Sequence, residues 1–300
     1  MIPIIIGCYA DAVTRRLSVL LALLVAVPLL AACSSTSSRS DSGVRQVVAA
    51  FYPLAFAAEQ VGGSSVEVEN LTPAGAEPHD LELTPGDVRD VQSATLVLYL
   101  GDGFMPALER ALRDRDGRSL DLLATARNGA PAKLANDPHV WLDPVRYASM
   151  VRAIGAELGE PAAAQRLSTR LLALDREYRQ GLAHCERHEL VTSHAAFGWL
   201  AARYGLEQVP LEGLTPEAEP SAKDIQRLVA TVRRTGATTV FAETLISPKL
   251  AETVAREADV QTAVLDPLEG IGKDELAQGA DYFTVMHSNL VALRKALGCR

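Results

Sequence analysis

Short apolar runs rich in β-branched residues alternate with helical stretches along most of this 300-residue chain. The runs predicted to form strands are 44–50, 66–68, 96–100, 190–192, 206–211, 238–241 and 260–265. The stretches predicted to form helices between and after them are 53–61, 88–93, 105–112, 197–204, 222–234, 247 onward and 274–297, the last with a break near Gly279. This order is typical of parallel sheets covered by helices and predicts an α/β fold.

A long helical region separates the two groups of strands. It begins at Val145, is interrupted at Gly159-Glu160-Pro161, and continues to about His184 with one apolar face. A helix of twenty-odd residues spans about 33 Å, roughly the breadth of a small domain. We therefore expect two βα lobes, at 44–160 and 186–300, with a binding site in the cleft between them. A rigid linking helix at 161–185 should join them rather than a hinge.

The N-terminal residues have the pattern of an export signal. Two arginines, Arg15 and Arg16, precede an apolar run at 17–32 that is too short to remain as a membrane span. The run ends in Leu-Ala-Ala-Cys, which resembles the bacterial lipoprotein box and predicts a signal peptide at 1–32 with lipidation of Cys33. Residues 33–43 are small and polar, so we expect a flexible tether. The protein should then be exported and lipid-anchored to the outer face of the cytoplasmic membrane.

The net charge indicates the class of ligand, and the cysteine content indicates a disulfide. The formal net charge is −8 and there is no basic run beyond the N-terminus, which argues against nucleic acid and favours a cation. Outside the cytoplasm, the remaining pair of Cys185 and Cys299 favours a disulfide, with two separate thiols as the alternative. We expect a monomer.

Three histidines and one aspartate occupy positions where an α/β sheet presents binding groups, in proline-marked loops or just beyond apolar runs. They are His79 in Glu-Pro-His-Asp, His139 in Asp-Pro-His-Val-Trp-Leu-Asp-Pro, His194 in Thr-Ser-His-Ala-Ala-Phe, and Asp266 in Val-Leu-Asp-Pro-Leu. A single loop histidine is weak evidence, because most lie at the surface or make ordinary hydrogen bonds. Together, three imidazoles and one carboxylate would form a tetrahedral set that suits zinc, whereas manganese prefers more oxygen.

The motifs at 77–80, 137–144, 192–206, 216–221 and 241–268, together with the lipoprotein box, are similar to those of the zinc and manganese solute-binding lipoproteins of ABC importers. The resemblance covers nearly all of the mature chain. It implies that His79, His139, His194 and Asp266 bind one metal ion, and that the loaded protein delivers it to a membrane permease. A histidine at the third position is associated mainly with zinc, so Zn(II) is the expected cargo and Mn(II) the alternative.

Two features depart from that family. The zinc importers often carry a histidine-rich loop between the first two ligands, but 101–137 contains no histidine, so we expect no accessory metal-collecting site. Many relatives also have an aspartate directly after the third histidine, where this chain has Ala195. The bond that this aspartate makes is either absent here or supplied by another residue, for which Glu243 is the candidate.

Besides a transport receptor, the sequence allows two other functions, a secreted zinc hydrolase and an adhesin or structural lipoprotein. A secreted zinc hydrolase would keep an open metal position for water, and no motif places a general base beyond the four ligands, so we expect no enzymatic turnover. An adhesin or structural lipoprotein with an incidental metal is the third reading. His184 and His188 have helical spacing but lack the His-Glu-x-x-His order of metalloproteases, and we expect a solvated helix end there.

Overall fold

The computed structural model describes residues 44–215 and 221–300. The predicted signal peptide at 1–32, the lipidation of Cys33, and the tether therefore lie outside the described residues, as does most of the motif at 216–221. Within the described ranges, no helix has both the length and the apolar character needed to cross a bilayer.

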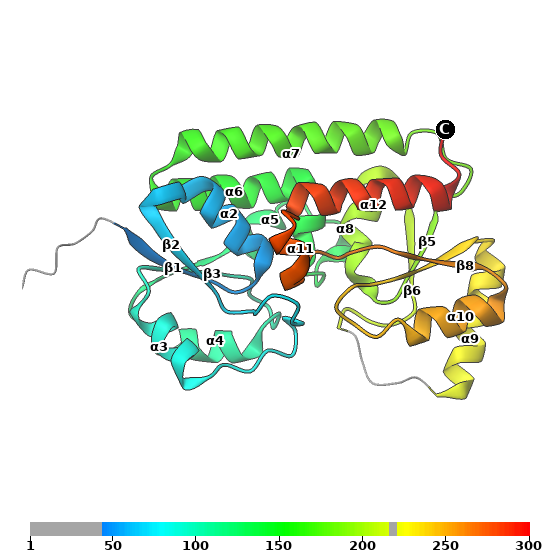
Figure 1. The fold of residues 1–300 in the computed structure, drawn as a ribbon, viewed down its shortest axis with the longest axis horizontal. Helices are drawn as coiled ribbons and strands as arrows, with labels where there is room; N and C mark the ends of the chain where they lie inside the picture. Colours follow the sequence, from blue (N-terminus) through cyan, green and yellow to red (C-terminus); the bar gives the residue numbers. More distant parts are fainter. Residues whose placement is uncertain (1–43, 216–220) are drawn as a thin grey trace, which may run out of the picture. The chain divides into compact units, whose positions relative to one another are not determined.

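The described residues form two four-stranded sheets in which every pairing is parallel (Figure 1). The first has the order β2-β1-β3-β4, with β1 at Arg45–Ala49, β2 at Val66–Asn70, β3 at Leu96–Tyr99 and β4 at Arg118–Asp121. The second has the order β6-β5-β7-β8, with β5 at Glu189–Thr192, β6 at Glu207–Pro210, β7 at Thr239–Ala242 and β8 at Gln261–Val264. The predicted α/β fold with a parallel sheet in each of two lobes is confirmed.

Helices follow the strands in both lobes. Those of the first lobe are α2 at Tyr52–Gly62, α3 at Pro85–Ser93, α4 at Pro106–Leu112 and α5 at Leu122–Ala126. Those of the second lobe are α8 at Gly198–Tyr204, α9 at Ala222–Thr235 and α10 at Lys249–Ala258. Strand β4 and helix α5 were not predicted. The β4 segment Arg-Ser-Leu-Asp is half-exposed and lacks an apolar run, so its pairing with β3 rather than its own pattern makes it a strand.

The predicted long helix is one arm of a helical pair. Helix α6 runs over Pro144–Leu158, the chain turns at Gly159 with a left-handed φ of 67°, and α7 runs over Pro161–Gly181. The two helices pack closely at Gly155, where an added Cβ would lie 2.3 Å from the Ala164 Cβ. Helix α7 thus packs against α6 rather than standing alone, and the rigid link between lobes stays a prediction. The lobe boundaries themselves stay predictions.

The C-terminal helix ties the second lobe back to the first. After α11 at Lys273–Ala277, the predicted break occurs at Gly279, and α12 runs over Tyr282–Leu297. Tyr282 is fully buried, its ring centroid lies 4.6 Å from that of Tyr147, and its hydroxyl donates to the Trp141 carbonyl at 2.7 Å. One continuous cluster of buried apolar side chains includes residues of both lobes, so the lobes share a core.

Cys185 and Cys299 form a disulfide across 114 residues of sequence, the pairing that the sequence favoured. The bond fastens the C-terminus beside the end of α7, where the backbone N–H groups of Glu186 and Arg187 also donate to the Leu297 carbonyl. The disulfide therefore closes a loop that contains the whole second sheet.

Replacing both cysteines with serine should lower the free energy of unfolding by about 2 to 5 kcal/mol, because the unfolded chain regains the freedom of a long closed loop. Chemical denaturation of the metal-free protein measures the change. Reduced wild-type protein is the matched control, since it loses the same bond without a substitution. Equal stability of the oxidised wild type and the double variant would contradict the prediction.

Candidate metal centre

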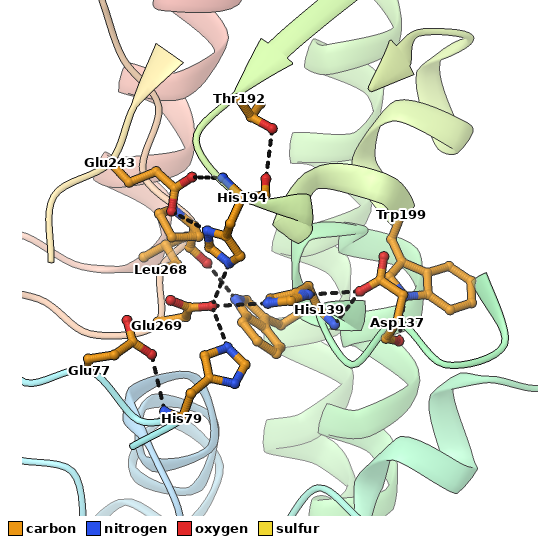
Figure 2. A network of polar contacts seen from close by, with 12 residues as sticks. Glu77, His79, Asp137, His139, Thr192, His194, Trp199, Glu243, Leu268 and Glu269 are labelled. Atoms are coloured by element: carbon orange, nitrogen blue, oxygen red, sulfur yellow. Dashed lines mark hydrogen bonds and ion pairs between the residues drawn. The ribbon is translucent and has the colours of Figure 1, made fainter. Parts of the chain in front are cut away.

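Three histidines and Glu269 converge on one point (Figure 2). One ligand atom from each of His79, His139, His194 and Glu269 lies within 4.8 Å of the others. The Glu269 Oε1 atom is 3.3 Å from the Nε2 atom of His79, 3.0 Å from that of His139 and 3.4 Å from that of His194. All three rings thus direct the same nitrogen toward a single carboxylate oxygen.

The four side chains come from loops of both lobes. His79 lies in the loop after β2, and His139 lies at the start of the short 3-10 turn Val140–Leu142 that precedes α6. His194 follows β5, and Glu269 lies in the loop beyond β8. His194 and Glu269 thus follow the carboxyl ends of parallel strands, where α/β proteins place binding groups. The three histidines predicted from the sequence are brought together.

The fourth member of the group differs from the sequence-based expectation. Asp266 is buried, but its Oδ1 atom accepts a hydrogen bond from the Leu268 N–H at 2.7 Å. Asn289 holds its backbone, accepting from the Asp266 N–H at 2.9 Å and donating to the Asp266 carbonyl at 2.7 Å. The carboxylate of Asp266 therefore shapes the turn, and Glu269, three residues later, joins the histidines instead.

The rule that binding groups follow strand ends points to Asp266, the first polar residue after β8, and not to Glu269. The chain continues through Pro267 and through Leu268, whose φ of 57° is left-handed, and this turn presents Glu269 inward. A sequence signal was available, since Glu269 lies between the apolar residues Leu268 and Ile271, both of which are buried. A carboxylate in an apolar stretch needs a partner, because burial of an unpaired charge is costly.

A second carboxylate supports each of two histidines from behind. The Asp137 Oδ1 atom lies 2.8 Å from the His139 Nδ1 atom and accepts the His139 backbone N–H at 2.9 Å. The Glu243 Oε2 atom lies 2.6 Å from the His194 Nδ1 atom, and its Oε1 atom accepts the His194 backbone N–H at 3.0 Å. Glu243, the candidate from the sequence, thus contacts the third histidine. A proton held on Nδ1 leaves Nε2 free to bind a metal ion.

The electrostatics of the metal-free group favour protons on the rings of His139 and His194. Burial alone lowers the pKa of His194, but contacts with Glu243 and Glu269 outweigh burial and raise that pKa to about 10. Burial also lowers the pKa of His139, but contacts with Asp137 and Glu269 outweigh burial and raise it above its ordinary value. Burial raises the pKa of Glu269, yet hydrogen bonds from the three histidines hold it well below its usual range. Burial and the neighbouring Glu269 raise the pKa of Glu77 to about 8.

Aromatic side chains surround the group and hold its loops. The Phe104 ring centroid lies 4.7 Å from that of His79, and the Trp141 ring lies 5.2 Å from that of His139. The Trp141 Nε1–H donates to the Pro267 carbonyl at 2.7 Å, which ties the Glu269 loop to the His139 segment. Side-chain exposure is 5% for His79, 0% for His139 and His194, and 1% for Glu269, so water has little access.

Other polar residues singled out in the sequence have structural positions. Asp143 caps α6 by accepting the N–H groups of Val145 and Arg146. Helix α7 ends at Gly181, so His184 and His188 do not share a helical face. In the part of the chain that the structure describes, the group of His79, His139, His194 and Glu269 is the set of potential ligands that converges, and its three nitrogens and one carboxylate oxygen suit a tetrahedral zinc ion.

Known proteins are similar to this chain in sequence and in fold. Zinc-binding protein AdcA of Streptococcus pyogenes serotype M18 is 34% identical over 287 residues, which cover 84% of this chain and 56% of AdcA. High-affinity zinc uptake system protein ZnuA of Bacillus subtilis is 31% identical over 299 residues, covering 90% of this chain and 94% of ZnuA. The chain therefore spans little more than half of the streptococcal relatives but nearly all of the Bacillus protein.

Solved structures agree with the sequence matches. The crystal structure of the Zn(II)-bound ZnuA-like domain of Streptococcus pneumoniae AdcA has a TM-score of 0.71 and 32% identity, covering 84% of this chain and 98% of that domain. Laminin-binding protein Lmb of Streptococcus agalactiae, described as having adhesin and metal transporting activity, has a TM-score of 0.73 and 28% identity, covering 84% of this chain and 99% of Lmb.

The profile of the family described as zinc-uptake complex component A, periplasmic, matches residues 47–296, which include both sheets and all four converging side chains. Together with relatives more than 30% identical over most of the chain, this match assigns the family. The chain belongs to the ZnuA family of periplasmic zinc-uptake components, as the motifs in its sequence predicted.

Proposed function

We propose that this protein is the metal-binding receptor of an ABC importer, which captures Zn(II) with His79, His139, His194 and Glu269 and delivers it to a membrane permease. The observation that carries the proposal is the convergence of three Nε2 atoms on one buried carboxylate, contributed by both lobes. The names of the relatives, which are zinc-binding and zinc-uptake proteins, support the same metal.

The donor set favours zinc over manganese. Three imidazole nitrogens and one carboxylate oxygen match the borderline-soft character and tetrahedral preference of Zn(II). Mn(II) prefers oxygen ligands and is the runner-up. The fourth donor is the carboxylate of Glu269 rather than that of Asp266, so the number and type of donor atoms are those expected from the sequence. The preference for zinc is therefore unchanged.

The surrounding residues prepare the site for exchange of protons for metal. Asp137 and Glu243 orient the rings of His139 and His194 through their Nδ1 atoms. When a divalent ion enters, it takes the place of the protons that the Nε2 atoms otherwise share with Glu269. Capture is therefore a competition between metal and protons, and the ion is cargo rather than a reagent.

Three further points belong to the same proposal. The protein performs no catalysis, because the relatives are named for zinc binding and zinc uptake rather than for an enzymatic reaction. The chain is anchored through a lipid on Cys33, which is supported by a relative named zinc-binding lipoprotein AdcA of Streptococcus pneumoniae. The partner is an importer permease, and the receptor acts outside the cytoplasm.

Replacing Glu269 with alanine should weaken zinc binding by more than about 100-fold, which exceeds the 10- to 100-fold loss typical of residues that only support a ligand. Asp266→Asn should weaken it by about tenfold or less, since Asp266 acts on the turn. Competition with a chromophoric chelator measures both affinities, and elemental analysis checks the stoichiometry. A larger loss in Asp266→Asn than in Glu269→Ala would restore Asp266 as the ligand.

Affinity for zinc should rise with pH between 6 and 8, because His139 and His194 have raised pKa values and must lose protons to bind metal. Loss of one to two protons predicts about a 10- to 100-fold gain per pH unit. Chelator competition across this range, with proton release measured by calorimetry in two buffers, checks the prediction. A flat pH profile would contradict it.

The metal-free protein should show the opposite trend in stability. The folded-state pKa of His194 is about 10, above the ordinary value of 6.5, so the folded state binds more protons between these pH values. The stabilisation is complete below about pH 6.5 and is lost as pH rises toward 10. Thermal melting of chelator-treated protein between pH 7 and 9.5 should give falling midpoints; rising midpoints would refute this assignment of protons.

Glu243→Gln should weaken zinc binding by about 10- to 100-fold, because His194 loses the carboxylate that orients its ring. The control is Glu252→Gln on α10, an exposed position that should leave affinity unchanged. Chelator competition measures the zinc affinity of both variants. Unchanged affinity in Glu243→Gln would show that Glu243 does not take over the role of the aspartate that many relatives have in place of Ala195.

A further inference from the structure

Helix α8 of the second lobe is bonded to both ends of the segment that carries His139. Trp199 donates its Nε1–H to the Asp137 carbonyl at 3.0 Å, and Arg203 donates its Nε–H to the Asp143 Oδ1 atom at 2.8 Å. Asp137 and Asp143 lie on either side of His139, at the two ends of 137–143. Because Trp199 and Arg203 are four residues apart, they lie on the same face of the helix.

The contacts between α8 and this segment are buried and closely fitted. Trp199 is 2% exposed, Asp143 3% and Asp137 4%, whereas the Arg203 side chain is 20% exposed, so the Trp199 bond is shielded from water and the Arg203 bond is partly shielded. At Gly198, the first residue of α8, an added Cβ would lie 2.6 Å from the Asp137 Oδ2 atom. The absence of a side chain there lets the helix approach the carboxylate that orients His139, as Figure 2 shows for Trp199 and Asp137.

Arg203 is at the centre of a group of charges that joins three helices. Its Nε atom lies 3.9 Å from the Asp175 Oδ1 atom on α7 as well as 2.8 Å from Asp143, which caps α6. Arg146 approaches the other oxygen of Asp143 at 3.5 Å and stacks over the Trp199 ring, with its guanidinium carbon 4.2 Å from the centroid.

Partly buried ion pairs of this kind add little stability, since desolvation offsets their attraction, but they fix the geometry of the groups that they join. These contacts affect the metal centre for two reasons. Helix α8 begins four residues after His194, and the residues that it bonds, Asp137 and Asp143, lie on either side of His139. The rings of His139 and His194 are 5.3 Å apart between centroids, and they belong to different lobes. Any slippage of α8 on 137–143 would change that separation.

We propose that Arg203 is a positioning residue for metal binding: with Trp199, it holds His139 and His194 at the separation that one ion requires, although it does not touch the ion. The inference rests on the proposed function, since it assumes that these histidines bind metal. Ligands held in place before binding lose little freedom on binding, so loss of the Arg203 bond should weaken affinity.

The test compares Arg203→Met, which keeps the apolar stem, with Arg179→Met. Arg179 bonds Asp175 at 2.9 Å from within α7 and is half-exposed, so it controls for loss of a charge from the same group. Chelator competition with zinc alone should show about a 10- to 100-fold loss for Arg203→Met, as for other residues that orient ligands, and about a twofold change or less for Arg179→Met. Arg203→Lys, which retains a donor, should recover part of the loss.

A purely structural role is distinguished by two further measurements on the same variants. The Co(II)-loaded Arg203→Met protein should show shifted or weakened visible absorption bands, which report ligand geometry, while Arg179→Met should match the wild type. Unfolding of each metal-free variant gives the accompanying stability change. If Arg203→Met does not fold, Trp199→Phe removes the other donor while keeping most of the ring, and should lose about tenfold in affinity.

Wild-type protein and Glu269→Ala separate the two proposals. Wild-type protein that binds no zinc would overturn the proposed function and this inference with it. If wild type binds and Glu269→Ala does not, while Arg203→Met keeps both wild-type affinity and the wild-type Co(II) spectrum, the inference alone falls. Equal losses of affinity in Arg203→Met and Arg179→Met would also overturn it.

Discussion

The interaction on which this structure depends is the burial of one carboxylate among three imidazole rings. Glu269 is almost fully enclosed, and its Oε1 atom lies within 3.4 Å of a ring nitrogen from His79, His139 and His194. An unpaired charge in that position would be strongly unfavourable, so the carboxylate needs either hydrogen bonds from ring N–H groups or a bound metal ion. In the proposed function, a divalent ion takes over the role of these hydrogen bonds as the positive partner of Glu269.

Polar atoms of large aromatic side chains hold the two lobes in the register that this site needs. Trp141 reaches the Pro267 carbonyl, Tyr282 reaches the Trp141 carbonyl, and Trp199 reaches the Asp137 carbonyl. Each bond joins a residue near His139 to an element of the second lobe. The bonds lie beside an apolar core that both lobes share, and α7 packs against α6.

The sequence predicted Asp266 as the fourth ligand, but the structure places Glu269 beside the three histidines. The rule that binding groups follow strand ends identified the correct loop, but it does not say which way the loop turns. Asp266 bonds the N–H of Leu268, Asn289 holds its backbone, and the left-handed Leu268 reverses the chain so that Glu269 enters the site. The Asn289 side chain lies on α12, far along the sequence, so the local pattern could not reveal it.

Periodicity and motifs alone were enough to predict the parallel α/β lobes, most strands and helices, and the three histidines, because these features depend on local patterns of apolar and polar residues. The sequence favoured a disulfide between Cys185 and Cys299, but their spacing could not exclude two separate thiols. Strand β4, the choice of Glu269 over Asp266, the contact of Glu243 with His194 and the contacts of α8 with the His139 segment required the folded chain. The physical reason is common to all four: each depends on an approach between segments that are separated in the sequence, and the packing of the folded chain decides which of the candidate residues meet.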